Sequence, residues 1–177
     1  TIGVVAGSED LMSWLWGFAV LQGANASPYD AYNAHRGVRT LDVRLRQQTE
    51  SARLLADFLE AHDAVSNVRY PGLASHPQHE LAERQMRSMG GLLTFDLAGG
   101  LDAGRRFVEA TSIARQATSL GGPETLLCHS ATTTHVSLTP EELEASGIGE
   151  GTVRVSCGLE NVGDLIADFE RGLDAAG

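Results

Sequence analysis

The stretch 151-GTVRVSCGLENVGDLIADFERGL-173 decides the fold. Val153, Val155 and Cys157 alternate with polar residues, as one buried face of a strand would. Asn161 is a favoured N-cap residue, and it precedes a helix with one apolar stripe. A half-buried strand followed at once by an amphipathic helix predicts a sheet with a helix packed against it.

Arg154 lies between the buried positions of that strand and points to the opposite face. Two interpretations fit the pattern. The guanidinium could face water on the open side of a half-buried sheet. Alternatively it could be held to grip an anion, because its planar fork matches a carboxylate.

Bulk composition limits the class of protein. The 177 residues carry a net charge of −10, which makes nucleic acid an unlikely partner. No apolar run approaches the ~20 residues that span a bilayer, so no membrane partner is expected. Cys128 and Cys157 suggest no disulfide framework, which favours the cytoplasm. All 13 basic residues are arginine, so no lysine here can form a Schiff base with an aldehyde cofactor.

Local patterns predict alternating helices and strands with short connections, in one α+β domain. Its sheet is small, mostly antiparallel and covered by helices on one face. Expected strands span 1–7, 65–71, 90–100, 112–118 and 151–157. Expected helices span 8–23, 40–62, 76–89, 101–111, 139–147 and 161–173, and a further helix is expected to begin after an N-cap at Ser27.

Two further segments carry polar groups that could bind a ligand. In 119-SLGGPE-124, Ser119 offers a hydroxyl and two glycines allow close backbone approach, although a tight turn would use the same residues. In 128-CHSATTTH-135, Cys128 and His129 are neighbours in an extended chain and point in opposite directions, which argues against a catalytic pair. His76 and His79 lack further ligands for zinc, and no metal site is expected.

Several segments together resemble the second half of the pyridoxal-phosphate enzymes of cysteine and methionine metabolism. This family contains cystathionine and methionine lyases, γ-synthases and O-acetylhomoserine sulfhydrylases. The resemblance covers essentially the whole chain. The segments, in order, are ASPYDAYNAHRGVRTLDVRLRQQTESA (26–52), VRYPGLASHPQHELAERQM (68–86), GGLLTFDL (90–97), SLGGPETLLCHSATTTH (119–135) and the 151–173 stretch.

The resemblance implies roles for three residues. The family's arginine on the last strand holds the α-carboxylate of the amino-acid substrate, and Arg154 matches it. Ser119 matches the serine beside the substrate, and Thr134 matches a threonine near the same pocket. The expected substrate-binding residues are therefore Arg154, Ser119 and Thr134. No catalytic or cofactor-binding residue is expected within the chain.

The resemblance also implies an architecture and partners. The fold would be the α/β, aminotransferase-like fold type I. Residues 1–37 would belong to the large cofactor-binding domain, 38–62 to a connector helix and 63–177 to the substrate-recognition domain. The lysine that carries pyridoxal phosphate would precede Thr1, in a missing N-terminal half. Homo-oligomerisation as a dimer of dimers is expected.

The function implied is that of a carbon–sulfur lyase part acting on a sulfur amino acid, with a γ-synthase or sulfhydrylase as the alternative. Thr118 stands where cystathionine-processing members carry a glutamate, which favours a smaller substrate. Ser130 and Thr133 replace the family's proline and methionine, so the local loop could differ. A non-catalytic assembly module is a further alternative, but it has no need of a carboxylate-binding arginine.

Overall fold

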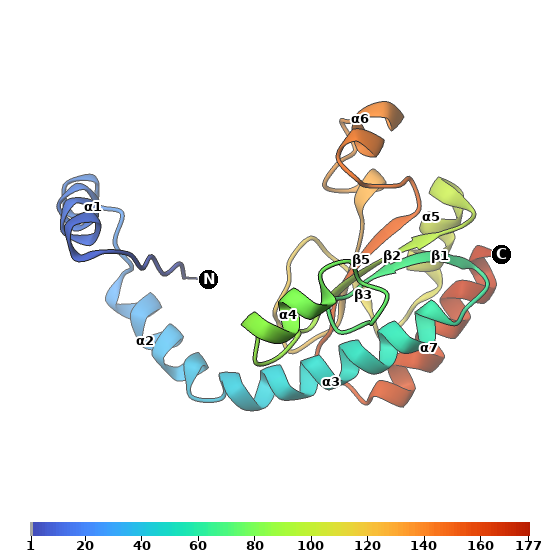
Figure 1. Ribbon diagram of the computed structural model, residues 1–177, viewed down its shortest axis with the longest axis horizontal. Helices are drawn as coiled ribbons and strands as arrows, with labels where there is room; N and C mark the ends of the chain where they lie inside the picture. Colours follow the sequence, from blue (N-terminus) through green and yellow to red (C-terminus); the bar gives the residue numbers. More distant parts are fainter. Residues whose placement is uncertain (1) are drawn as a thin grey trace. The chain divides into compact units, whose positions relative to one another are not determined.

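A computed structural model describes residues 2–177, which form two compact units divided between Val43 and Arg44. The first unit contains α1 (Glu9–Gln22) and α2 (Pro28–Val38) (Figure 1). The side chains of Ser8 and Ser27 accept hydrogen bonds from the first turns of these helices, as their N-cap positions predict. Neither helix buries a residue within the structure.

The strand expected at residues 1–7 is a wrong prediction for the described part, because residues 2–7 form no strand. A strand is stable only when a neighbouring strand pairs with its backbone. The sheet of the structure contains no strand from this unit. Thr1 lies outside the described residues.

The second unit is built on a five-stranded sheet in the order β1-β2-β5-β4-β3 (Figure 1). Only the β3–β4 pair is parallel, so the predicted mostly antiparallel sheet is confirmed. The strands are β1 (Val65–Arg69), β2 (Leu92–Leu97), β3 (Arg115–Gln116), β4 (Leu126–His129) and β5 (Thr152–Ser156).

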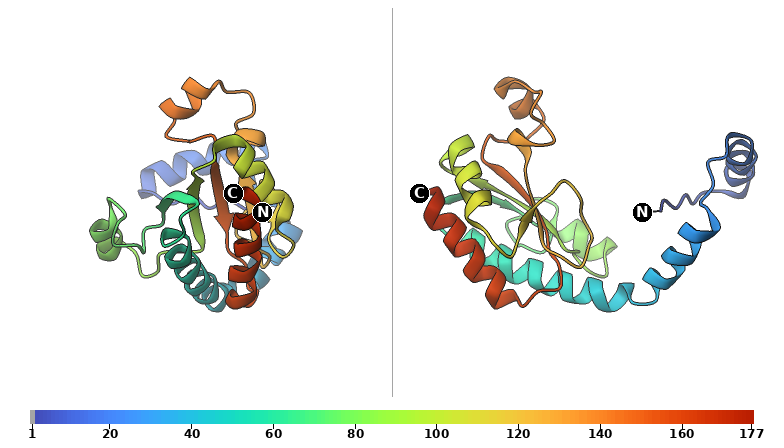
Figure 2. Two further views of the ribbon diagram at one scale, coloured as in Figure 1. Left: turned by 90° about the vertical axis from the view of Figure 1, so that its right-hand side faces the viewer. Right: turned by 180° about the vertical axis from the view of Figure 1, so that it is seen from behind.

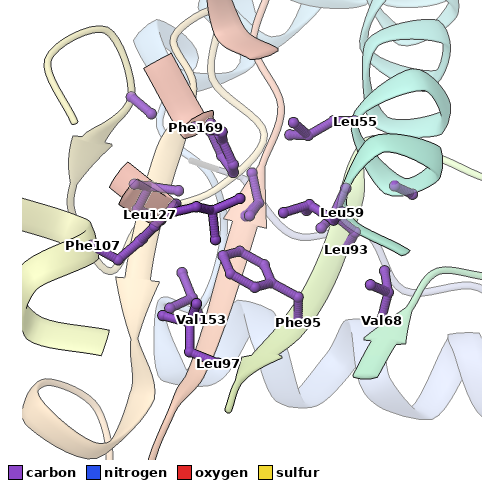
Figure 3. Packing of buried hydrophobic residues seen from close by; sticks show 14 of the residues in the cluster. Leu55, Leu59, Val68, Leu93, Phe95, Leu97, Phe107, Leu127, Val153 and Phe169 are labelled. Carbon is purple, nitrogen blue, oxygen red and sulfur yellow. The ribbon is translucent and has the colours of Figure 1, made fainter. Parts of the chain in front are cut away.

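One face of this sheet is covered by α3 (Leu41–Glu60), α5 (Gly100–Ala110) and α7 (Val162–Ala176), as predicted (Figure 2). Three phenylalanines join the layers: Phe95 of β2, Phe107 of α5 and Phe169 of α7 (Figure 3). The Phe107 ring meets the other two edge-to-face, at centroid distances of 5.2 and 5.3 Å. Burying these large rings on one face leaves the polar positions of β5 on the other.

The remaining helices are short, and they lie in the connections between strands. Instead of spanning 76–89, α4 runs from His79 to Gln85. Residues 70–79 make successive turns first, in which the amides of Leu73, His76 and His79 each donate to a carbonyl three residues earlier. The 3₁₀ turn η1 (Ser130–Thr132) follows β4, and α6 (Pro140–Ala145) begins with the predicted capping box of Thr139 and Glu142. No helix among residues 2–177 has the length and apolar character needed to cross a bilayer.

A buried carboxylate explains why the strand expected over 112–118 shrinks to Arg115 and Gln116. Asp168 of α7 accepts hydrogen bonds from the amides of Ser112, Ile113 and Ala114 at 2.8–3.0 Å. Those amides cannot also join a sheet ladder. Burial alone would raise the pKa of Asp168, but the bonds from Ala114, Ser112 and Ile113 outweigh it and lower the pKa.

We expect Asp168→Asn to reduce the free energy of unfolding by about 2–4 kcal/mol, because an amide NH₂ would face backbone donors. Urea unfolding at pH 7 measures this change. The folded pKa lies below the unfolded value, so this stabilisation is present above about pH 4 and is lost as pH falls through the folded pKa. Asp174→Asn, on an exposed position of the same helix, serves as the control. Equal effects of the two substitutions would contradict the role of Asp168.

Candidate substrate-carboxylate site

Strand register places a polar row across the open face of the sheet. Arg154 of β5 pairs with Thr94 of β2 on one side and with Cys128 of β4 on the other. Directly paired residues point to the same face, so these three side chains lie side by side. Val153 and Val155 point to the buried face, as their alternation predicts.

The guanidinium of Arg154 is fixed by the loop that follows β3. Its Nη2 donates to the carbonyl oxygens of Thr118 and Ser119, both at 2.9 Å. Its Nε is buried and has no hydrogen-bond partner among the described residues. A buried, charged donor without an acceptor is costly, so the geometry suits an additional anionic acceptor. Arg154 is therefore not splayed into bulk solvent, and its side chain meets the segment of Ser119.

The 119–122 loop is held to the sheet and to α3 by side chains. Gly121 has a φ of +73°, a left-handed conformation that glycine adopts without strain. Its amide donates to Ser156 Oγ at 2.8 Å, and Gln48 Nε2 donates to the Gly122 carbonyl at 2.7 Å. These bonds order the carbonyls that grip Arg154.

A second anchor fixes the end of the same loop. The carboxylate of Glu160 accepts the Thr125 amide at 2.6 Å and the Thr125 hydroxyl at 2.7 Å. Thr125 Oγ1 in turn accepts the Gly158 amide at 2.8 Å. Thr125, just before β4, is thus hydrogen-bonded to Gly158 and Glu160, which follow β5.

The structure brings the three predicted residues to one region. Ser119 is exposed, and its carbonyl contacts Arg154. Thr134 is also exposed, and its Oγ1 lies 3.8 Å from the sulfur of Cys128, the register partner of Arg154. Thr134 Oγ1 also lies 2.8 Å from Nδ1 of His135. One exposed hydroxyl residue thus contacts Arg154 through its backbone, and the other contacts the side chain of its register partner, Cys128.

His129 belongs to the opposite, buried face, so it does not join Cys128 in a catalytic pair. Its Nε2 lies 2.8 Å from the Glu150 carbonyl, which can only accept, so Nε2 carries the proton. Nδ1 then accepts from the hydroxyl of Thr132 at 2.9 Å. Burial lowers the pKa of His129, which keeps the imidazole neutral.

His129 is packed against α5, and we expect Gly104→Ala to disrupt this packing. A Cβ at Gly104 would lie 2.2 Å from His129 Nε2. The substitution should reduce the free energy of unfolding by about 2–3 kcal/mol. Thermal unfolding followed by circular dichroism is the measurement. Gly17→Ala is the matched helical control, because its Cβ would meet nothing within 4 Å and alanine favours helix. A melting temperature of Gly104→Ala equal to that of the parent would refute this packing.

A largely apolar cavity of about 320 Å³ adjoins the 119–122 loop. Its lining includes Leu45, Met86, Met89, Gly121 and Ser156. A separate cavity of about 350 Å³ follows the outer edge of β1. Arg154, Ser119 and Thr134 line neither of these two cavities.

Sequence reasoning missed several supports of this site. Gln48 and Ser156 hold the loop, and the Thr118 carbonyl holds Arg154. None of these has a local signal, because each acts across a large sequence separation. The strand β4 was also missed, since its polar neighbours obscured the short apolar run 126-LLC-128.

The comparisons with known proteins identify the family. The sequence model of the Cys/Met metabolism PLP-dependent enzymes matches residues 1–174. The chain belongs to this family.

Its relatives include lyases and a sulfhydrylase. The chain is 47% identical to the L-methionine gamma-lyase of Porphyromonas gingivalis over 98% of its own length and 44% of that protein. It is 43% identical to the O-succinylhomoserine sulfhydrylase of Pseudomonas aeruginosa, over 98% of its length and 43% of that protein. The chain therefore spans less than half the length of these relatives.

A solved structure supports the fold assignment. The cystathionine gamma synthase of Xanthomonas oryzae pv. oryzae, in complex with cystathionine, superposes with a TM-score of 0.91 and 42% identity. The match covers 97% of this chain and 44% of that one. The predicted relation to the fold-type I enzymes is confirmed.

The chain's own residues do not fit one part of the family's cofactor chemistry. The family depends on pyridoxal phosphate, whose aldehyde is carried by an amine. These 177 residues contain no lysine. What the described residues offer instead is a guanidinium that is fixed by two carbonyl oxygens and has an unsatisfied buried donor.

Proposed function

We propose that this chain forms the substrate-recognition part of a pyridoxal-phosphate-dependent carbon–sulfur lyase, in which Arg154 binds the α-carboxylate of a sulfur amino acid. The observation that carries the proposal is the loop-anchored guanidinium with its unpaired, buried Nε. A carboxylate would supply both the missing acceptor and the opposite charge.

A lyase reaction is favoured over synthesis or sulfhydrylation by the relatives. Several of the most similar curated proteins are methionine gamma-lyases, with identities of 42–47%. Thr118 also adds no charge beside the Arg154 guanidinium. A substrate with an uncharged thioether side chain therefore fits this side of the site better than one with a distal ammonium group. The γ-synthase and sulfhydrylase reactions remain the alternatives within the family.

The chain's residues would act by orientation. Arg154 would fix the carboxylate while the 118–119 carbonyls keep the guanidinium from rotating. The hydroxyl groups of Ser119 and Thr134 would supply further polar groups near the bound amino acid. Holding the carboxylate restricts rotation of the substrate about its Cα bonds, which aligns the bond to be broken.

When bound, pyridoxal phosphate would act as an electron sink that eases removal of the Cα proton of the amino acid. We propose that the lysine which carries it, and which moves this proton, comes from residues outside these 177. Arg154 has no such role, because a guanidinium remains protonated in proteins. The division of labour is therefore recognition in this chain and covalent chemistry elsewhere.

We also propose that α1 packs against that missing half, within a dimer of dimers located in the cytoplasm. Trp14 and Trp16 of α1 are 66% and 67% exposed, and Val4 is 90% exposed. Exposed apolar surface of this kind marks an interaction surface.

The unpaired thiols of Cys128 and Cys157 fit a reducing compartment. Light scattering of the holoenzyme would test the tetramer.

We expect Arg154→Ala in the holoenzyme to raise KM for the amino acid about a hundredfold, because a desolvated arginine–carboxylate pair contributes several kcal/mol. Arg154→Lys should recover only part of the loss, since lysine cannot reproduce the fork. Steady-state kinetics separate KM from kcat. Arg105→Ala, at an exposed position of α5, is the control. An Arg154→Ala enzyme with unchanged KM and kcat would remove Arg154 from the site.

Mixing the purified chain with pyridoxal phosphate tests the division of labour. The Schiff base of pyridoxal phosphate with a lysine gives an absorption band at the violet end of the visible spectrum. We expect no lysine Schiff-base band from the isolated chain, because the chain has no lysine. The holoenzyme should show the band, and borohydride reduction followed by peptide mass mapping should place the modified lysine outside these residues. A borohydride-stable adduct on a side chain of these residues would contradict the proposal, whereas an adduct on the α-amine of the isolated chain would not, because any free amino terminus can form a Schiff base.

A further inference from the structure

The face that carries Arg154 also carries a thiol to which the proposed function gives no role. Cys128 is the register partner of Arg154 on β4, so the two side chains leave the sheet on the same side. Cys128 is 2% exposed, yet it is not part of the apolar core on the other face. The second cysteine, Cys157, does belong to that core.

The hydrogen-bond direction at Cys128 can be worked out from its neighbours. Thr133 Oγ1 donates to the His129 carbonyl at 2.7 Å, which uses its single hydrogen. The contact of 3.1 Å between Cys128 Sγ and Thr133 Oγ1 must then run from the thiol to the hydroxyl. Cys128 is the donor that sets the orientation of Thr133.

This relay fixes the turn after β4. Thr133 is tied to this turn by its amide, which donates to the Ser130 carbonyl at 3.3 Å, and by its hydroxyl, which contacts the His129 carbonyl and the Cys128 sulfur. Thr134 follows directly, and its hydroxyl lies 3.8 Å from the same sulfur. A change in the thiol would therefore act on Thr133 and Thr134, whose hydroxyl groups both lie near the sulfur.

We propose that Cys128 is a positioning residue for the substrate: its thiol orients Thr133 and thereby holds Thr134 beside Arg154. The inference rests on the proposed carboxylate site and assigns it a support that the family comparison does not name. Cys128 does not act as a nucleophile in this role, because its hydrogen is engaged by Thr133.

Two substitutions in the holoenzyme separate a hydrogen-bonding role from mere filling of space. Cys128→Val fills the space without a donor, and Cys128→Ser keeps a donor. We expect Cys128→Val to raise KM for the amino acid about five- to tenfold with kcat within twofold, which corresponds to one hydrogen bond. Cys128→Ser should stay within about twofold of the parent KM.

Thr133→Val provides a second path to the same result, since it removes the acceptor and leaves the thiol in place. It should raise KM by a factor similar to that of Cys128→Val, and the double variant should add little more. Cys157→Ser is the matched control, because that thiol is buried in the core. It should lower the melting temperature and leave KM unchanged.

The outcomes distinguish this inference from the proposed function. If Cys128→Val and Thr133→Val keep the parent KM while Arg154→Lys raises it, the positioning role is wrong and the carboxylate site stands. If Cys128→Ser is as impaired as Cys128→Val, the hydrogen bond is not the cause. If Arg154→Lys also leaves KM unchanged, the proposed function itself fails.

Discussion

The contact between the Arg154 guanidinium and the carbonyls of residues 118 and 119 is the interaction on which this site depends. It joins the guanidinium on the open face of the sheet to the carbonyls of the loop that follows β3. It also uses both hydrogens of Nη2 and leaves Nε buried without an acceptor. The same contact thus fixes the cation in place and leaves it able to bind an anion.

The rest of the unit can be understood as support for that contact. The phenylalanines of β2, α5 and α7 pack together on one face of the sheet and make that face apolar. The row of Thr94, Arg154 and Cys128 therefore lies on the other face. Gln48 and Ser156 hold the loop from two further elements. A precise site therefore rests on rigid strands, with the loop tied down at several points.

The predictions from sequence succeeded where a local period or cap was present. The alternation around Arg154, the stripe of the last helix and the Asn161 cap all appear in the structure. They failed where a side chain that is distant in the sequence binds the backbone amides, as Asp168 binds those of residues 112–114. The N-terminal strand failed because no strand of the described residues pairs with residues 2–7.

The candidate site residues show the same contrast between features with a local sequence signal and features set by tertiary contacts. The pattern alone left open whether Arg154 faces water or an anion, and the resemblance to a family pointed to the carboxylate. The bonds that hold the guanidinium, and the relay from Cys128 to Thr134, join segments through tertiary contacts that no periodicity signals. Such contacts become visible only when the register of β4 and β5 is known.

The most direct test of the central claim is the ¹H–¹⁵N resonance of Arg154 Nε in the holoenzyme. Assignment by comparison with Arg154→Lys identifies the signal. Addition of methionine should move it downfield, as a carboxylate accepts the unpaired N–H, and 3-(methylthio)propylamine, which lacks the carboxylate, should not. An Nε signal that ignores methionine, or that responds equally to the amine, would contradict the account.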